Sequence, residues 1–121
     1  MRLCWCRVCQ SIAAGNASVN VVFPSDALTI EGEPRDYPST ADSGTRMHRR
    51  FCPDCGTHLF SEAESRPHLV IVRNGALDDT GLLKPGATIW TDSAPAWACI
   101  DDSLPRHAGQ PPPLPPAPRG T

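Results

Sequence analysis

The chain has 121 residues, six cysteines, 14 prolines and a formal net charge of -2, which is enough for one small domain. This charge argues against the basic face that nucleic-acid-binding domains use, and no stretch approaches the roughly 20 apolar residues that cross a bilayer. We therefore expect a cytoplasmic protein that binds neither nucleic acids nor membranes.

Short runs of β-branched and aromatic residues, separated by turn residues, predict a mainly β domain of short antiparallel strands. Proline and glycine end these runs, for example at residues 24–26 and 74–75. Two segments have the pattern of one or two helical turns, residues 7–13 and 77–80. We expect strands at residues 19–23, 28–31, 47–51, 57–60, 69–73, 88–91 and 97–100.

The composition changes near residue 105. Residues 110–121 contain six prolines and no apolar periodicity, which is typical of an extended segment without a core. We expect a zinc-binding β domain at residues 1–104 and a disordered Pro-rich tail at residues 105–121. Such a tail is also a possible ligand for a Pro-recognising domain. The sequence indicates no particular oligomeric state.

Five of the six cysteines fall into two clusters whose spacing indicates metal binding. Cys4, Cys6 and Cys9 form a C-x-C-x2-C pattern, and Cys52 and Cys55 form a C-x2-C knuckle. Thiolates one or two residues apart suit one metal ion better than mutual disulfides, because a disulfide requires Cβ separations that close neighbours rarely reach without strain.

The spacing permits two arrangements of the metal ligands. Three thiolates from Cys4, Cys6 and Cys9 can hold an ion and leave one coordination position open, as at catalytic zinc. Alternatively, Cys4 and Cys6 combine with Cys52 and Cys55 in one closed four-sulfur site, and Cys9 stays unused. The spacing alone does not distinguish these arrangements.

Five motifs follow one another in a specific order: CWCRVCQ at residues 4–10, YPS to DSG at 37–44, RFCPDCG at 50–56, VRNGALDD at 72–79 and IWTDSAPAW at 89–97. Together they resemble the glutathione-dependent formaldehyde-activating enzyme family, also called S-(hydroxymethyl)glutathione synthase-like, which has a β-tent zinc fold. The resemblance covers nearly all of the chain before the tail.

The resemblance implies a carbon–sulfur lyase that joins glutathione and formaldehyde as S-hydroxymethylglutathione. By this resemblance Cys4, Cys6 and Cys9 hold the catalytic Zn2+, and Cys52 and Cys55 supply half of a structural zinc site. The implied partners are a small thiol such as glutathione and an aldehyde. The tripeptide has two carboxylates, for which forked arginine side chains are candidate donors: Arg7, Arg46, Arg49, Arg50 and Arg73.

The chain departs from the family at the structural site. In the family the other two thiolates come from a C-x-C ahead of the catalytic segment, and no C-x-C precedes Cys4 here. We expect a truncated gene model or a wrong start codon. The alternatives are a shortened protein in which Cys4 and Cys6 complete the structural site, and two chains that share one ion through their knuckles. Among the histidines, His58 is the best substitute for a missing ligand.

Two other functional classes compete with the enzyme. A noncatalytic zinc-stabilised binding module, or an inactive truncated homologue, requires one closed four-sulfur site and an exposed apolar patch. A methionine-sulfoxide-reductase-like protein requires a reactive cysteine outside the metal sites, and only Cys99 is available. Because Cys99 and Trp97 lie in an apolar run, we expect Cys99 to be a buried, inert thiol and Trp97 to be a core or pocket residue.

Overall fold

The structure is a computed structural model that describes residues 1–112. It contains a seven-stranded sheet, with little helix, and confirms the mainly β fold. The strands follow the order β3-β4-β5-β6-β2-β1-β7 across the sheet. Their bounds are β1 Arg2–Cys4, β2 Ser18–Pro24, β3 Arg35–Thr40, β4 Arg46–Phe51, β5 His58–Ala63, β6 Leu69–Arg73 and β7 Ala87–Ile89.

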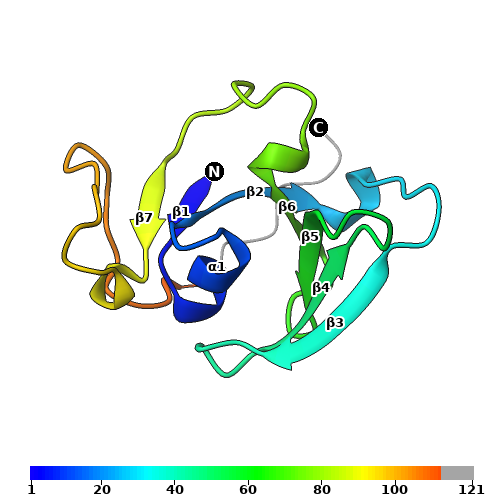
Figure 1. The fold of residues 1–121 in the computed structure, drawn as a ribbon, viewed down its shortest axis with the longest axis horizontal. Helices are drawn as coiled ribbons and strands as arrows, with labels where there is room; N and C mark the ends of the chain where they lie inside the picture. Colours follow the sequence, from blue (N-terminus) through cyan, green and yellow to red (C-terminus); the bar gives the residue numbers. More distant parts are fainter. Residues whose placement is uncertain (113–121) are drawn as a thin grey trace.

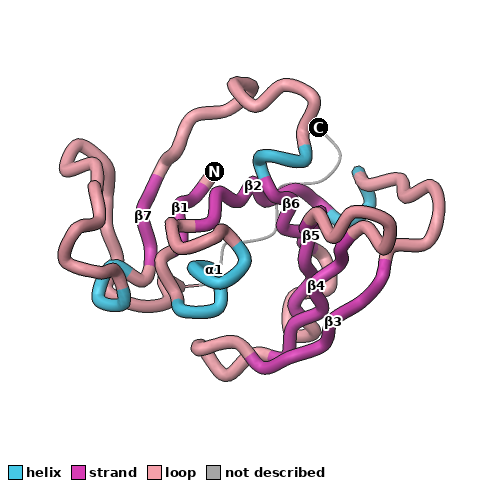
Figure 2. Tube along the Cα trace, in the orientation of Figure 1, coloured by secondary structure: helices cyan, strands magenta, loops and turns pink. Residues whose placement is uncertain are grey.

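Helical structure in the described chain is one short α-helix and three 3-10 turns. Figure 2 draws the helical segments in cyan. The helix is α1 (Arg7–Ile12), and the turns are η1 (Ser25–Ala27), η2 (Asn74–Ala76) and η3 (Thr91–Ser93). No helix among the described residues is long and apolar enough to span a bilayer.

The pairing is antiparallel throughout the sheet except between β1 and β7, which are parallel. Figure 1 shows α1 between β1 and β7 on one side and β3, β4 and β5 on the other. In the strand order, β2 and β6 lie between β1 and β7 on one side and β3, β4 and β5 on the other, and thus connect these two sides of the sheet.

The two faces of the sheet differ in chemistry, because side chains alternate along each strand. On one face Phe60, Val70 and Val72 are buried and pack against Phe23. The opposite face lines a cavity and carries polar, charged and sulfur-containing side chains from five strands: Arg2, Cys4, Asn20, Arg49, Ser61 and Arg73.

Several predicted elements are confirmed. The expected strands at residues 19–23, 47–51 and 69–73 lie within β2, β4 and β6, and the strand expected at residues 57–60 begins one residue later as β5. The helix expected at residues 7–13 is α1.

Other predicted elements are wrong. Residues 28–31 and 97–100 form no strand, and residues 77–80 form no helix. β7 ends at Ile89 because the next residue, Trp90, has a left-handed backbone with φ 58°. Two strands were missed: β1 is only three residues long, and β3 is an exposed edge strand that contains a proline.

The first residues of the predicted tail contact the sheet. The Thr88 N–H donates to the carbonyl oxygen of Pro105 at 2.9 Å, and the His107 N–H donates to the carbonyl oxygen of Thr88 at 2.9 Å. These bonds satisfy backbone groups at the outer edge of β7. Contacts with the sheet therefore extend beyond the boundary that we drew at residue 105, and residues 113–121 of the tail lie outside the described residues.

Candidate metal centre

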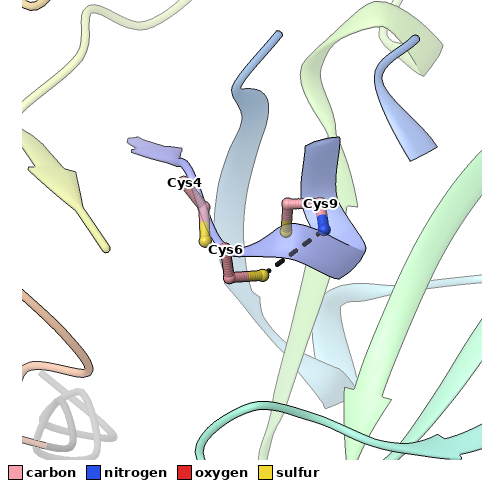
Figure 3. Close-up of side chains that lie close together, drawn as sticks. All are labelled: Cys4, Cys6 and Cys9. Atoms are coloured by element: carbon pink, nitrogen blue, oxygen red, sulfur yellow. Dashed lines mark hydrogen bonds between the residues drawn. The ribbon is translucent and has the colours of Figure 1, made fainter. Parts of the chain in front are cut away.

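Cys4, Cys6 and Cys9 lie close together at the junction of β1 and α1 (Figure 3). All three are buried, with 6%, 6% and 7% of their surface exposed, and their sulfur atoms lie within 4.8 Å of one another. In a tetrahedral zinc site with Zn–S bonds of about 2.3 Å, two sulfurs are about 3.8 Å apart. The cluster could therefore hold a metal ion that prefers thiolate ligands.

Local structure brings these sulfurs together. Cys4 is the last residue of β1 and pairs with Ser18 and Ile89 of the neighbouring strands. Cys6 is the N-cap of α1, and its sulfur accepts a hydrogen bond from the N–H of Cys9 at 3.3 Å. A cap residue and the residue three positions later face each other across the first helical turn, which explains the C-x2-C spacing.

The loop between β1 and α1 is held by the side chain of Gln10. Its amide nitrogen donates to the carbonyl oxygen of Trp5 at 2.7 Å and to that of Ser93 at 3.0 Å. Because these bonds tie the start of α1 to the segment after β7, the positions of Cys4 and Cys6 depend on contacts that are distant in the sequence.

The cluster favours negative charge on one sulfur. Hydrogen bonds with Cys4 and Cys6 hold the pKa of Cys9 well below its usual range, and Ser18 and the charge of Arg73 act in the same direction. The pKa of Cys4 is raised, chiefly by its hydrogen bonds with Cys6 and Cys9 and then by burial. When cysteine sulfurs bind a divalent cation, the cation replaces the protons that the thiols share in these hydrogen bonds.

A cavity of about 110 Å3 adjoins the cluster and is lined by its three sulfur-containing side chains. Four arginines, Arg2, Arg49, Arg66 and Arg73, also line this cavity, and the acidic side chain in its wall is that of Asp42. The cavity thus combines candidate metal ligands with an excess of positive charge.

Of the five arginines that are candidate carboxylate donors, only some line the cavity. Arg49 and Arg73 face the cavity, whereas Arg7 and Arg46 are exposed and do not line it. Arg50 points elsewhere and pairs with Asp36 at 3.6 Å. The sequence reasoning missed Arg2 and Arg66. The strand alternation between Arg2 and Cys4 is a signal that would have identified Arg2 once β1 was recognised.

Cys52 and Cys55 form a separate turn between β4 and β5. The N–H of Gly56 donates to the carbonyl oxygen of Cys52 at 2.8 Å, and Gly56 has a φ of +76°, which favours glycine. Cys55 is exposed, and its sulfur lies 3.1 Å from the hydroxyl oxygen of Thr57, which lowers the pKa of this thiol.

The two cysteine clusters do not merge into one closed site. Within the described chain, the group of three or more potential ligands lying within 4.8 Å is Cys4, Cys6 and Cys9. Neither His58 nor a member of the first cluster joins Cys52 and Cys55 at that distance. The geometry therefore favours the three-thiolate arrangement over the closed four-sulfur alternative.

Two expectations for the segment after β7 are wrong. Cys99 is exposed rather than buried, and 65% of the surface of Trp97 is exposed. Trp97 packs its ring edge-on against the buried Trp5, with ring centroids 6.2 Å apart. The physical reason is that residues 97–100 lie outside the sheet, so their apolar side chains have no second layer to cover them.

Comparison with known proteins gives one family match. The model of the family described as "Glutathione-dependent formaldehyde-activating enzyme" matches residues 1–93, which is 93 of the 121 residues. The matched segment contains both cysteine clusters and all of the strands described above. No curated protein matches the sequence.

Proposed function

The chain belongs to the glutathione-dependent formaldehyde-activating enzyme family, and from this premise we propose that it is a zinc-dependent carbon–sulfur lyase acting in the cytoplasm. Its reaction would join glutathione and formaldehyde as S-hydroxymethylglutathione. The observation that supports this proposal most directly is the buried Cys4, Cys6 and Cys9 cluster beside a cavity.

The chemistry of the donor set fits Zn2+. A closed structural zinc site uses four protein ligands, whereas a catalytic zinc site uses three. The cluster offers three sulfur ligands and therefore matches the catalytic count. Cys4, Cys6 and Cys9 would hold the ion through their sulfur atoms. When bound, the ion would stabilise the thiolate form of a substrate thiol at neutral pH.

The overall reaction needs no oxidant or reductant. The sulfur of glutathione adds to the carbonyl carbon of formaldehyde, a C–S bond forms, the C=O double bond becomes a single bond, and the thiol proton ends on the oxygen. The chain's own contribution is to bind and orient the thiol in the cavity. Holding two reactants together raises the rate by removing the entropy cost of their encounter.

Exchange spectroscopy by NMR tests this proposal, because glutathione and formaldehyde also combine without a catalyst. We expect the zinc-loaded protein to accelerate the exchange of isotope-labelled formaldehyde between the free and glutathione-bound forms. Cys9→Ser should abolish the acceleration, whereas Cys99→Ser, which removes an exposed thiol outside the cluster, should retain it. Equal exchange rates with and without the wild-type protein would reject the enzyme.

The binding-module alternative lacks the closed zinc site that it requires. It needs a closed site formed by Cys4, Cys6, Cys52 and Cys55, and these four cysteines do not come together in the described structure. The exposed Trp97 and Leu82 belong to different loops and do not by themselves define a docking surface.

A further inference from the structure

We propose that Arg49 and Arg73 form a carboxylate-binding site in the wall of the cavity, and that this site selects thiols that carry a carboxylate over neutral thiols. That the ligand is a thiol rests on the proposed function, whereas the anion site rests on the two arginines. In the sequence analysis these two residues were among five arginines considered as carboxylate donors, with nothing to distinguish them from the other three.

Both side chains are buried without a charged hydrogen-bonding partner. Only 4% of the surface of Arg49 and 9% of that of Arg73 is exposed. The ion pairs of arginine found in the described chain involve Arg46, Arg50 and Arg106 instead. No carboxylate of the described chain forms an ion pair with Arg49 or Arg73, and the negative charge that acts on Arg73 is that of the Cys9 sulfur. A buried cation is costly unless an anion pairs with it, so both guanidinium groups favour an incoming carboxylate.

Each guanidinium retains unused donors. Arg49 donates from Nη1 to the hydroxyl of Ser39 at 2.6 Å, and Arg73 donates from Nη1 to the side-chain oxygen of Asn20. Both acceptors are neutral. The Nε atom of each arginine is buried and has no hydrogen-bond partner. An incoming carboxylate would satisfy these donors, because guanidinium and carboxylate match as a two-pronged pair.

The register of the sheet directs both arginines into the same cavity. Arg49 in β4 lies opposite Ser61 in β5, and Ser61 lies opposite Ile71 in β6. Arg73 is two residues beyond Ile71 and therefore shares its face. All four side chains line the cavity, so β4, β5 and β6 hold the two positive charges on one wall.

The surrounding charges favour an anion over a cation. Arg2 and Arg66 add positive charge to the cavity, and the acidic lining residue Asp42 accepts a hydrogen bond from the backbone N–H of Arg7 at 3.3 Å. The charge of Arg73 also attracts the negative charge of the Cys9 sulfur. The cysteine cluster is, however, the place where the thiol of a ligand would bind. A small thiol with a carboxylate could thus place its sulfur near the cluster and its carboxylate near Arg49.

Glutathione has two carboxylates and fits this description. The experiment uses S-methylglutathione, whose sulfur is blocked, so that its binding reports on the anion site and not on the thiol reaction. Isothermal titration of the full chain, with its metal content measured, compares this ligand with its dimethyl ester, which lacks both negative charges. We expect the ester to bind at least about tenfold more weakly, because hydrogen bonds to charged groups are strong.

Matched variants assign the effect to the cavity. Arg49→Gln should weaken S-methylglutathione binding about tenfold or more and leave ester binding nearly unchanged, and Arg49→Lys should fall between this variant and wild type. Arg46→Gln is the control: it removes the same charge from the same strand, but at an exposed position where Arg46 faces Glu64 at 4.0 Å. It should bind S-methylglutathione as wild type does.

Equal binding of S-methylglutathione and its ester to the wild-type protein would overturn the inference, and this comparison needs no variant to fold. An equal loss in Arg46→Gln and Arg49→Gln would overturn it too, because the effect would then reflect net charge. Failure of the proposed function is distinguishable. In that case formaldehyde exchange would not be accelerated, yet the charge preference for S-methylglutathione would persist.

Discussion

Replacement of Cys9 by serine should remove most of the zinc affinity of the cluster. The sulfur of Cys9 is one of three that lie within 4.8 Å of one another, and no other described cysteine is close enough to replace it. Structural zinc contributes about 10–16 kcal/mol to the folding of domains that bind it with four ligands, or about 3 kcal/mol per ligand. Loss of one sulfur would then weaken zinc binding about 100-fold.

Two measurements test this magnitude. Elemental analysis of purified protein should show that Cys9→Ser loses about one equivalent of zinc relative to wild type. Competition with a chromogenic chelator then gives the change in affinity. Because a ligand at 1,000 times its dissociation constant stabilises the folded state by about 4.1 kcal/mol, chelation should lower the melting temperature of wild type and hardly affect Cys9→Ser.

The control for this experiment is Cys99→Ser, which removes an exposed thiol and should keep the zinc content and affinity of wild type. The reasoning is refuted if Cys9→Ser retains all of its zinc with wild-type affinity. It is also refuted if the zinc disappears only in Cys52→Ser, because the ion would then be bound by the knuckle and not by the cluster.

Three further predictions concern stability. His58 has a lowered pKa, chiefly because of burial and then because of Arg73 and Arg49. As the pH falls, the unfolded state binds a proton at this histidine before the folded state does, so acidification should destabilise the protein. His58→Asn should show a weaker dependence of stability on pH in thermal melts between about pH 5.5 and 7.5. Val70→Ala should lower the free energy of unfolding by about 2 kcal/mol in urea titrations, because Val70 is 1% exposed, whereas Leu82→Ala at a 60% exposed position should change it by less than about 0.5 kcal/mol. Gly56→Ala should cost about 1 kcal/mol in the same titrations, because an L-residue at a φ of +76° is strained, and a cost near zero would contradict the backbone argument.

Much of the fold could be predicted from sequence patterns. The strands β2 and β6 contain runs of β-branched and apolar residues, whereas β4 has apolar residues only at Met47 and Phe51. The limits of all three strands were predicted to within one residue. Residues 28–31 and 97–100 have the same local pattern but form no strand, because a strand also requires a neighbour with free hydrogen-bonding groups. β3 was missed for the opposite reason: its partner β4 supplies six paired positions to a segment with weak strand propensity.

The candidate metal centre was predictable because its residues are neighbours in the chain. Cys4, Cys6 and Cys9 are separated by a few residues, and the geometry of a strand end and one helical turn is enough to bring their sulfurs together. The sequence by itself therefore determined the identity of the candidate ligands and, through the order of the motifs, the family.

The charged wall of the cavity was decided only by the tertiary structure. Arg2, Arg49, Arg66 and Arg73 come from separate parts of the chain, and until the strands and their pairing are known nothing distinguishes them from the exposed Arg7 and Arg46. Strand pairing and register determine which face each arginine occupies, and a shift of one residue would turn it to the opposite face. Because pairing depends on contacts between distant residues, no local pattern specifies which arginines become buried beside the cysteines.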